Sequence, residues 1–191
     1  MKKSKLIIVE GPQGAGKTTV TDYIRDVLPH TNLYRLNGIS DSSITGFEKS
    51  KKMYFNLLDY MKNMEGLDIN LLFDRTFFSE ENYCRLGKKS YSFTNAYNEL
   101  VQNLDKLDFE IIYITLYLKN TSLFDKRLKR DEKKGPEYAK YIANSSIEQQ
   151  NMYLKMAEEL KLNTKNLNIF TLANDESITS IKTKLNSILN I

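Results

Sequence analysis

The stretch EGPQGAGKTT, at residues 10–19, decides the fold of this chain. It contains the four fixed positions of the pattern G-x-x-x-x-G-K-[ST]: Gly11, Gly16, Lys17 and Thr18. The apolar run at 6–9 before it reads as a short buried strand, and residues 19–28 after it carry apolar side chains at helical spacing. A strand before the loop and a helix after it favour nucleotide binding over a glycine-rich turn with a surface lysine.

The residue types of this loop suit a triphosphate. Gly11, Gly14 and Gly16 allow backbone conformations closed to residues with a Cβ, so that successive N–H groups can point at the phosphates. The helix that starts near Lys17 adds the positive end of its dipole. The Lys17 ammonium can follow the β- and γ-phosphates, and the Thr18 hydroxyl can ligate Mg²⁺.

Composition narrows the class of protein. A length of 191 residues without internal repeats fits one domain, residues 1–191. The net charge of +4 suits an enzyme of small anionic molecules and is too weak to argue for duplex nucleic acid. One cysteine and one histidine exclude disulfide frameworks and Cys/His zinc sites. The first residues do not resemble a signal peptide, and the apolar stretch at 111–118 is too short for a bilayer, so we expect a soluble cytoplasmic protein with no membrane partner.

Apolar periodicity predicts an alternation of strands and helices. Further strands are expected at 32–36, 68–73, 109–118 and 167–172, and helices at 19–28, 44–65, 76–86, 94–107, 121–130, 139–161 and 177–189. Such alternation means right-handed crossovers and parallel strands. The expected fold is therefore a three-layer α/β domain with a five-stranded parallel sheet and helices on both faces.

The predicted strand at 68–73 delivers Asp74 and Arg75 at its carboxyl end. Ligands bind at that edge of open α/β sheets. A carboxylate there can hold the Mg²⁺ shell or accept a proton, and a guanidinium offers a planar fork for a phosphate on a second molecule. The alternative is an ion pair at a strand end.

Absent motifs narrow the class of nucleotide-binding protein. No glycine has an aspartate three residues before it, and no Asn-Lys pair occurs, which argues against a regulatory GTPase. The chain leaves little room for the larger body of an ATP-driven motor. A small kinase remains the best interpretation.

Three stretches resemble the thymidylate kinase family of P-loop kinases, and more distantly the deoxynucleoside kinases. Residues 10–19 are similar to its E-G-x-x-G-A-G-K-T-T loop. Residues 74–83, DRTFFSEENY, are similar to its D-R-Y-x-x-S-x-x-A-Y pattern, with four matching positions: Asp74, Arg75, Ser79 and Tyr83. Residues 117–130 resemble its strand-to-lid segment, and residues 173–178 lie where its adenine-side loop would be.

The resemblance implies ATP and Mg²⁺ as cofactors, a small nucleotide or nucleoside as acceptor, and a homodimer. The residues that would hold ATP are Gly11, Gln13, Gly14, Ala15, Gly16, Lys17, Thr18, Thr19 and Asn174, with Thr18 and Asp74 toward the metal. The residues that would contact the acceptor are Arg35, Arg75, Ser79 and Tyr83. The catalytic set would be Lys17, Asp74, Arg75, Arg127 and Arg130.

Arg127 and Arg130 belong to a small basic lid expected at about 126–138. They would place positive charge on the transferring phosphoryl group and help to expel water. The stretch KRLKRDEKK carries six basic residues and is followed by Gly135 and Pro136, which could act as a hinge. The alternative is a solvated helix end.

The acceptor side departs from the family pattern. Gln13 replaces an acid, Thr76 replaces a tyrosine, Cys84 replaces a glutamine that reads the base, and residues 35–38 only echo an R-E-P-G segment. The sequence therefore leaves the acceptor open. A nucleoside monophosphate leads, and a deoxynucleoside or another hydroxyl, such as a nucleic acid end or a modified base, is the alternative.

The residues leave two other functions open. A deoxynucleoside kinase needs a carboxylate near the 5′-hydroxyl, for which Glu10, Asp74 and Glu80 are candidates. A regulatory module that binds ATP without an acceptor is the alternative of another class. Asp74, Arg75 and the basic segment argue against it.

Overall fold

The protein is described by a computed structural model that covers residues 3–132 and 142–191. The five strands are β1 (Lys5–Glu10), β2 (Thr31–Arg35), β3 (Asn70–Asp74), β4 (Glu110–Tyr117) and β5 (Leu167–Ala173). All neighbouring strands pair in parallel, in the order β2-β3-β1-β4-β5. The five-stranded parallel sheet expected from the sequence is confirmed.

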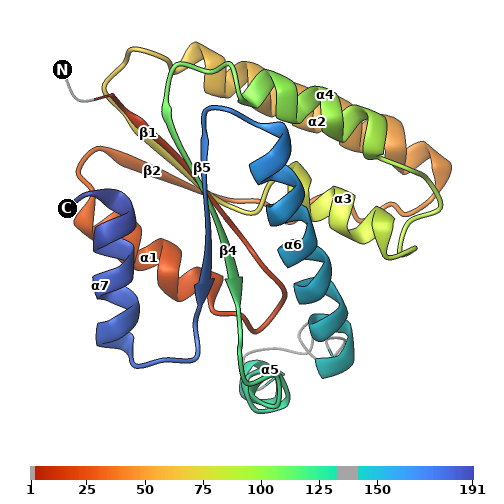
Figure 1. Cartoon of the computed structure of the whole chain (residues 1–191). Helices are drawn as coiled ribbons and strands as arrows, with labels where there is room; N and C mark the ends of the chain where they lie inside the picture. Colours follow the sequence, from red (N-terminus) through yellow and green to blue (C-terminus); the bar gives the residue numbers. More distant parts are fainter. Residues whose placement is uncertain (1–2, 133–141) are drawn as a thin grey trace.

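Helices cover both faces of the sheet (Figure 1). One face carries α1 (Lys17–Val27) and α7 (Ile178–Leu189), and the other carries α2 (Ile44–Asn63), α3 (Phe77–Arg85), α4 (Thr94–Leu104) and α6 (Ala143–Asn163). A further helix, α5 (Leu123–Glu132), lies beyond the carboxyl end of β4. The expected three-layer arrangement is therefore present. Within the described ranges, no helix combines the length and apolar character needed to cross a membrane.

The central strand β1 explains why the sequence begins with an uninterrupted apolar run. Leu6 and Ile8 face the core under α2, α3, α4 and α6, whereas Ile7 and Val9 face the core under α1 and α7. All four side chains are fully buried. A strand covered on both faces needs apolar residues at every position, unlike a strand with one solvated face.

The register of the sheet fixes the position of the site. Val9 pairs with Asp74, and the backbone N–H of Arg75 donates to the Val9 carbonyl at 3.1 Å. The chain after β1 and the chain after β3 therefore leave the sheet side by side. This is the carboxyl edge, where open α/β sheets bind ligands.

Helix α1 begins at Lys17, where the sequence analysis placed its start, directly after Gly16 in the left-handed conformation. Helix α6 begins at Ala143, after an extended Ile142, and the earlier part of the expected helix at 139–141 lies outside the described residues. Of the expected lid at 126–138, residues 126–132 form part of α5 and the rest also lies outside the described residues.

Candidate active site

The loop between β1 and α1 has the backbone that its glycines allow. Gly11, Gly14 and Gly16 have φ values of 146°, 83° and 88°. A Cβ on Gly11 would stand 2.6 Å from the Leu116 carbonyl oxygen, so neither the conformation nor the space admits a side chain there. The sequence therefore specifies this loop at its glycines, as expected for a phosphate-binding turn.

Lys17 lies inside this loop. Its ammonium donates to the Pro12 carbonyl at 2.9 Å, and the residue is buried. Burial, and after it the charge of Arg75, lowers the pKa of Lys17 to about 7, although Asp74 and Glu10 act in the opposite direction. In the described part of the chain Lys17 forms no salt bridge, so its charge can be taken up by an anion that enters the loop.

Asp74 and Arg75 lie next to the phosphate loop, as expected. The Arg75 guanidinium donates to Gln13 Oε1 at 3.1 Å, which ties it directly to the loop. Arg75 has φ of 73°, a left-handed conformation that is uncommon for a residue with a side chain. Asp74 faces Arg35, whose Nε is 3.9 Å from its carboxylate. The loop, an acid and two arginines thus meet at one edge of the sheet.

Glu10, the last residue of β1, joins the phosphate loop to α3. One carboxylate oxygen accepts from the Thr76 backbone N–H at 2.7 Å and from the Thr76 hydroxyl at 3.2 Å. The other accepts from the Ser79 hydroxyl at 2.7 Å. Burial raises the pKa of Glu10 to about 7, against the opposing effects of these hydrogen bonds, Arg75 and Lys17. Glu10 therefore holds the first turn of α3, which follows Arg75, against the loop.

Arg127 and Asn174 contact the other side of the phosphate loop. Arg127 donates to the carbonyls of Gly14 at 3.2 Å and Asn174 at 2.7 Å. The Asn174 side chain donates to the Ala15 carbonyl at 2.6 Å. Helix α5 and the segment after β5 are therefore attached to the loop by direct hydrogen bonds.

The other expected site residues divide into two groups. Thr18 and Thr19 are exposed at the start of α1, and Tyr83 is half-buried on α3. Arg130 is exposed and donates to Asp131 at 3.3 Å, and among the described residues no hydrogen bond or ion pair joins it to the phosphate loop.

The Ser79 hydroxyl, expected to contact the substrate, is hydrogen-bonded to two side chains of the protein. Besides its bond to Glu10, its hydroxyl lies 2.7 Å from the Tyr153 hydroxyl of α6. The sequence analysis did not identify Tyr153, because it lies 74 positions after Ser79 and forms part of a helix with an apolar pattern. Ser79 thus forms part of the support of α3, and its contact with a substrate stays a prediction.

The phosphate loop offers few oxygen atoms that could bind a metal ion, and these are hydroxyl and carboxylate oxygens. No group of three or more His, Cys, Asp or Glu side chains suited to a metal occurs among the described residues. Thr18 and Asp74 are the oxygen donors at the loop that the sequence indicated. Such a sparse set fits Mg²⁺, which usually takes one or two protein ligands and completes its shell with phosphates and water.

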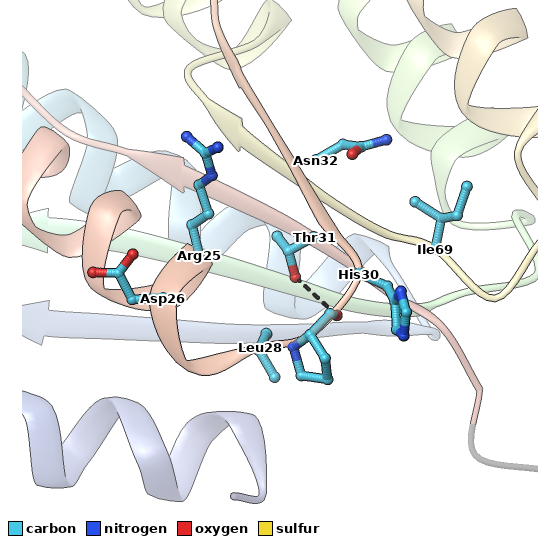
Figure 2. A pocket seen from close by; sticks show the side chains of 8 residues that line it. Arg25, Asp26, Leu28, His30, Thr31, Asn32 and Ile69 are labelled. Carbon is cyan, nitrogen blue, oxygen red and sulfur yellow. Dashed lines mark hydrogen bonds between the residues drawn. The ribbon is translucent and has the colours of Figure 1, made fainter.

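A surface hollow lies elsewhere, at the amino end of β2 (Figure 2). It is bordered by residues that connect α1 to β2, with Ile69 before β3. The charged groups of Arg25 and Asp26 point away from each other and do not converge on one point (Figure 2). This hollow is at the edge of the sheet opposite the phosphate loop, and it offers no comparable chemistry.

Comparisons with known proteins give fold-level matches. No protein-family model matches the chain, and no curated protein matches it. Among solved structures, a thymidylate kinase from Candida albicans matches with a TM-score of 0.64 and 13% identity, covering 98% of this chain and 92% of that one. The fold is that of a P-loop kinase.

Two further P-loop kinases agree. Polyphosphate kinase 2 from Arthrobacter aurescens TC1 matches with a TM-score of 0.63 and 16% identity over 100% of this chain and 69% of that one. A deoxyadenosine kinase from M. mycoides matches with a TM-score of 0.61 and 18% identity over 97% and 98%. The expected P-loop kinase fold is confirmed. The likeness shows the fold, and both the activity and the acceptor have to be argued from the site.

Proposed function

We propose that this chain is an ATP-dependent phosphotransferase that moves the γ-phosphoryl group to a nucleoside monophosphate, in the manner of a thymidylate kinase. The observation that carries the proposal is the hydrogen bond between Arg75 and Gln13. It places a second cation against the phosphate loop, beside Asp74 and near Lys17. A module that only binds ATP has no need of this second cation.

On the donor side, the loop amides and Lys17 bind the triphosphate, with Thr19 at the start of the helix. Thr18 and Asp74 hold Mg²⁺ together with the phosphates. The Thr18 hydroxyl makes no hydrogen bond to the described residues and is exposed, so it is free to ligate the metal. When bound, Mg²⁺ neutralises charge on the phosphate oxygens. Lys17 enters the protonated state as the anion restores its pKa, which puts full positive charge where negative charge develops.

On the acceptor side, Arg75 and Arg35 bind the phosphate of the monophosphate, with Tyr83 beside them. The Arg75 side chain is held by Gln13 and its backbone N–H by the Val9 carbonyl of β1, so its planar fork is oriented before the acceptor arrives. Arg35 is exposed and pairs with Asp22 as well as Asp74, so it has room to turn toward an anion. Glu10 and Ser79 position α3 and do not need to touch the acceptor.

The chain acts as a single domain, residues 1–191, with a lid at 126–138. Arg127 at the phosphate loop and Arg130 on the same helix stabilise the transferring group. Burial lowers the pKa of Arg127, and the neighbouring charge of Arg130 lowers it further. A triphosphate that binds between the two arginines relieves the repulsion between their charges.

A nucleoside hydroxyl is the second candidate acceptor. Deoxyadenosine kinase is among the structural neighbours. Among the residues that the structure describes, the Asp74 carboxylate has one ion pair, at 3.9 Å with Arg35, so it can accept the proton of an attacking hydroxyl. Glu10 is less suited to that role because both of its oxygens are bonded to Thr76 and Ser79. The two acceptors differ by one phosphate, so one assay separates them.

The test is a screen with γ-labelled ATP and Mg²⁺ against all nucleosides, their monophosphates and short oligonucleotides. We expect label transfer to at least one nucleoside monophosphate. Lys17→Ala should reduce transfer at least about a hundredfold without loss of the fold, because one preorganised charge contact with the phosphates is removed. Transfer at the wild-type rate by Lys17→Ala would contradict the assignment of the loop. ATP binding with no transfer to any acceptor would leave the regulatory module as the better interpretation.

A further inference from the structure

Gln150 of α6 supports the chain where it leaves β4 on the way to α5. Its Oε1 accepts a hydrogen bond from the Leu118 N–H at 2.8 Å, and its Nε2 donates to the Leu118 carbonyl at 3.1 Å. Gln150 is 4% exposed and Leu118 is 1% exposed. One side chain therefore supplies partners for both backbone groups of a buried residue that lies just past the end of β4.

Leu118 begins the segment that leads to Arg127. The backbone N–H of Asn120 in this segment donates to Asp175 at 2.7 Å, and α5 follows. Arg127 of α5 donates to the Gly14 carbonyl of the phosphate loop at 3.2 Å. Helix α5 also packs against α6 (Figure 1). The position of Arg127 at the phosphate loop thus depends on where this segment leaves the sheet.

The same face of α6 also contacts the other side of the site. Tyr153 lies three residues after Gln150, and residues three apart share one face of a helix. The Tyr153 hydroxyl lies 2.7 Å from the Ser79 hydroxyl, which donates to Glu10 at 2.7 Å. Helix α6 is therefore bonded through Gln150 to the segment before α5 and through Tyr153 to α3.

We propose that Gln150 is a positioning residue for phosphoryl transfer, because it fixes the segment after β4 and so holds Arg127 at the phosphate loop. Gln150 acts through Arg127 and does not itself contact the donor or the acceptor. This inference rests on the proposed function, and it adds to it a residue of α6 that no motif of the sequence indicates.

The physical basis is the cost of leaving backbone groups unpaired in a buried segment. Without the Gln150 amide, the N–H and the carbonyl of Leu118 lose partners that water cannot readily replace in a buried position. The segment then shifts until these groups find other partners, and α5 shifts with it. A displacement of about 1 Å in a group that orients a reaction can lower turnover by up to about a hundredfold.

Gln150→Met tests this role, because methionine keeps the length and the helix propensity of glutamine but has no amide. We expect kcat for phosphoryl transfer to fall about tenfold, with the KM values for ATP and for the acceptor within about twofold of wild type. In an Arg127→Ala background the same substitution should change kcat less than twofold, since Gln150 acts through Arg127. Gln150→Glu keeps an acceptor for the Leu118 N–H but loses the donor to the carbonyl, so it should also lower kcat and not raise the KM values.

Amide hydrogen exchange reports on α5 without any acceptor. Amides of residues 119–132 should exchange at least about tenfold faster in Gln150→Met than in the wild type, while those of α3 keep the wild-type rate. Gln149→Met is the matched control. Gln149 is the preceding residue of α6 and is 5% exposed, but its side chain donates to Ser145 of the same helix, at 3.3 Å. Gln149→Met should leave both kcat and the exchange of residues 119–132 unchanged.

Three results would overturn the inference and leave the kinase proposal standing. The first is an unchanged kcat in both Gln150→Met and Gln150→Glu. The second is an equal loss of kcat with and without the Arg127 side chain. The third is equal exchange of residues 119–132 in the wild type and in Gln150→Met. Absence of transfer by the wild type to every acceptor overturns the proposed function and the inference together.

Discussion

At the scale of single residues, the buried ammonium of Lys17 makes ATP binding depend on pH. With a pKa near 7, Lys17 is about half protonated at neutral pH and must gain a proton to meet the triphosphate. The phosphates raise its pKa in the complex. Binding should therefore be strongest below pH 7 and weaken by up to about tenfold per pH unit above it.

Calorimetry of ATP binding in two buffers of different ionisation enthalpy checks this expectation. Proton uptake should be about half a proton at pH 7 and approach one proton at pH 8 to 9. Lys17→Ala is the control, and its residual binding should take up no such proton. Wild-type binding without proton uptake across this range would show that Lys17 is already charged before ATP arrives.

Substitutions at two glycines can distinguish the cost of an unfavourable backbone conformation from the cost of a steric clash. Gly11 and Gly87 both have positive φ, but a Cβ on Gly87 meets nothing within 4 Å, whereas a Cβ on Gly11 meets the Leu116 carbonyl at 2.6 Å. Gly87→Ala should cost about 1 kcal/mol of unfolding free energy. Gly11→Ala should cost about 3 kcal/mol or more, because the backbone of β4 must also move. Urea unfolding measures both, and equal losses would contradict the close approach at Gly11.

At the scale of elements, Glu10 holds the start of α3. Glu10→Ala leaves the buried N–H of Thr76 without its acceptor, which should cost about 2 kcal/mol and raise the KM for the acceptor because Arg75 precedes this turn. Tyr153→Phe removes only the hydroxyl beside Ser79, so it should cost about 1 kcal/mol. Denaturant unfolding and steady-state kinetics compare the two. An unchanged acceptor KM in Glu10→Ala would mean that α3 does not need this bond for its position.

The sequence predicted those elements whose signal is local. The apolar run before Gly11 predicted β1, and the apolar run before Asp74 correctly placed that acid at the carboxyl end of a strand beside the loop. The start of α1 near Lys17 was also predicted, and it follows Gly16, whose left-handed φ is 88°.

The contacts that complete the site carry no local signal. Tyr153 reaches Ser79 across 74 positions, and Tyr91 and Lys89 meet Glu80 only because the turn after α3 folds back. A tyrosine inside an apolar helical pattern is predicted to be a core residue, and its hydroxyl gives no further signal. Such partners follow from packing between elements, which spacing along the chain does not encode.

At the scale of the whole molecule, the order of the strands brings the chemistry together. Because β3 and β4 flank β1, the phosphate loop emerges between the chain that carries Asp74 and Arg75 and the chain that leads to α5 with Arg127 (Figure 1). All of these groups leave the carboxyl edge of a parallel sheet. The donor and the acceptor of a phosphoryl group can therefore be bound from opposite sides of one loop.

The most direct measurement of this central claim is the steady-state kinetics of Arg75→Ala, with ATP affinity determined separately by equilibrium binding. Removal of a charged contact with the acceptor phosphate should lower kcat/KM for the acceptor by about 10- to 100-fold. ATP affinity should change less than twofold, since the loop keeps its glycines and Lys17. Weaker ATP binding with unchanged acceptor parameters would place Arg75 on the donor and contradict the account.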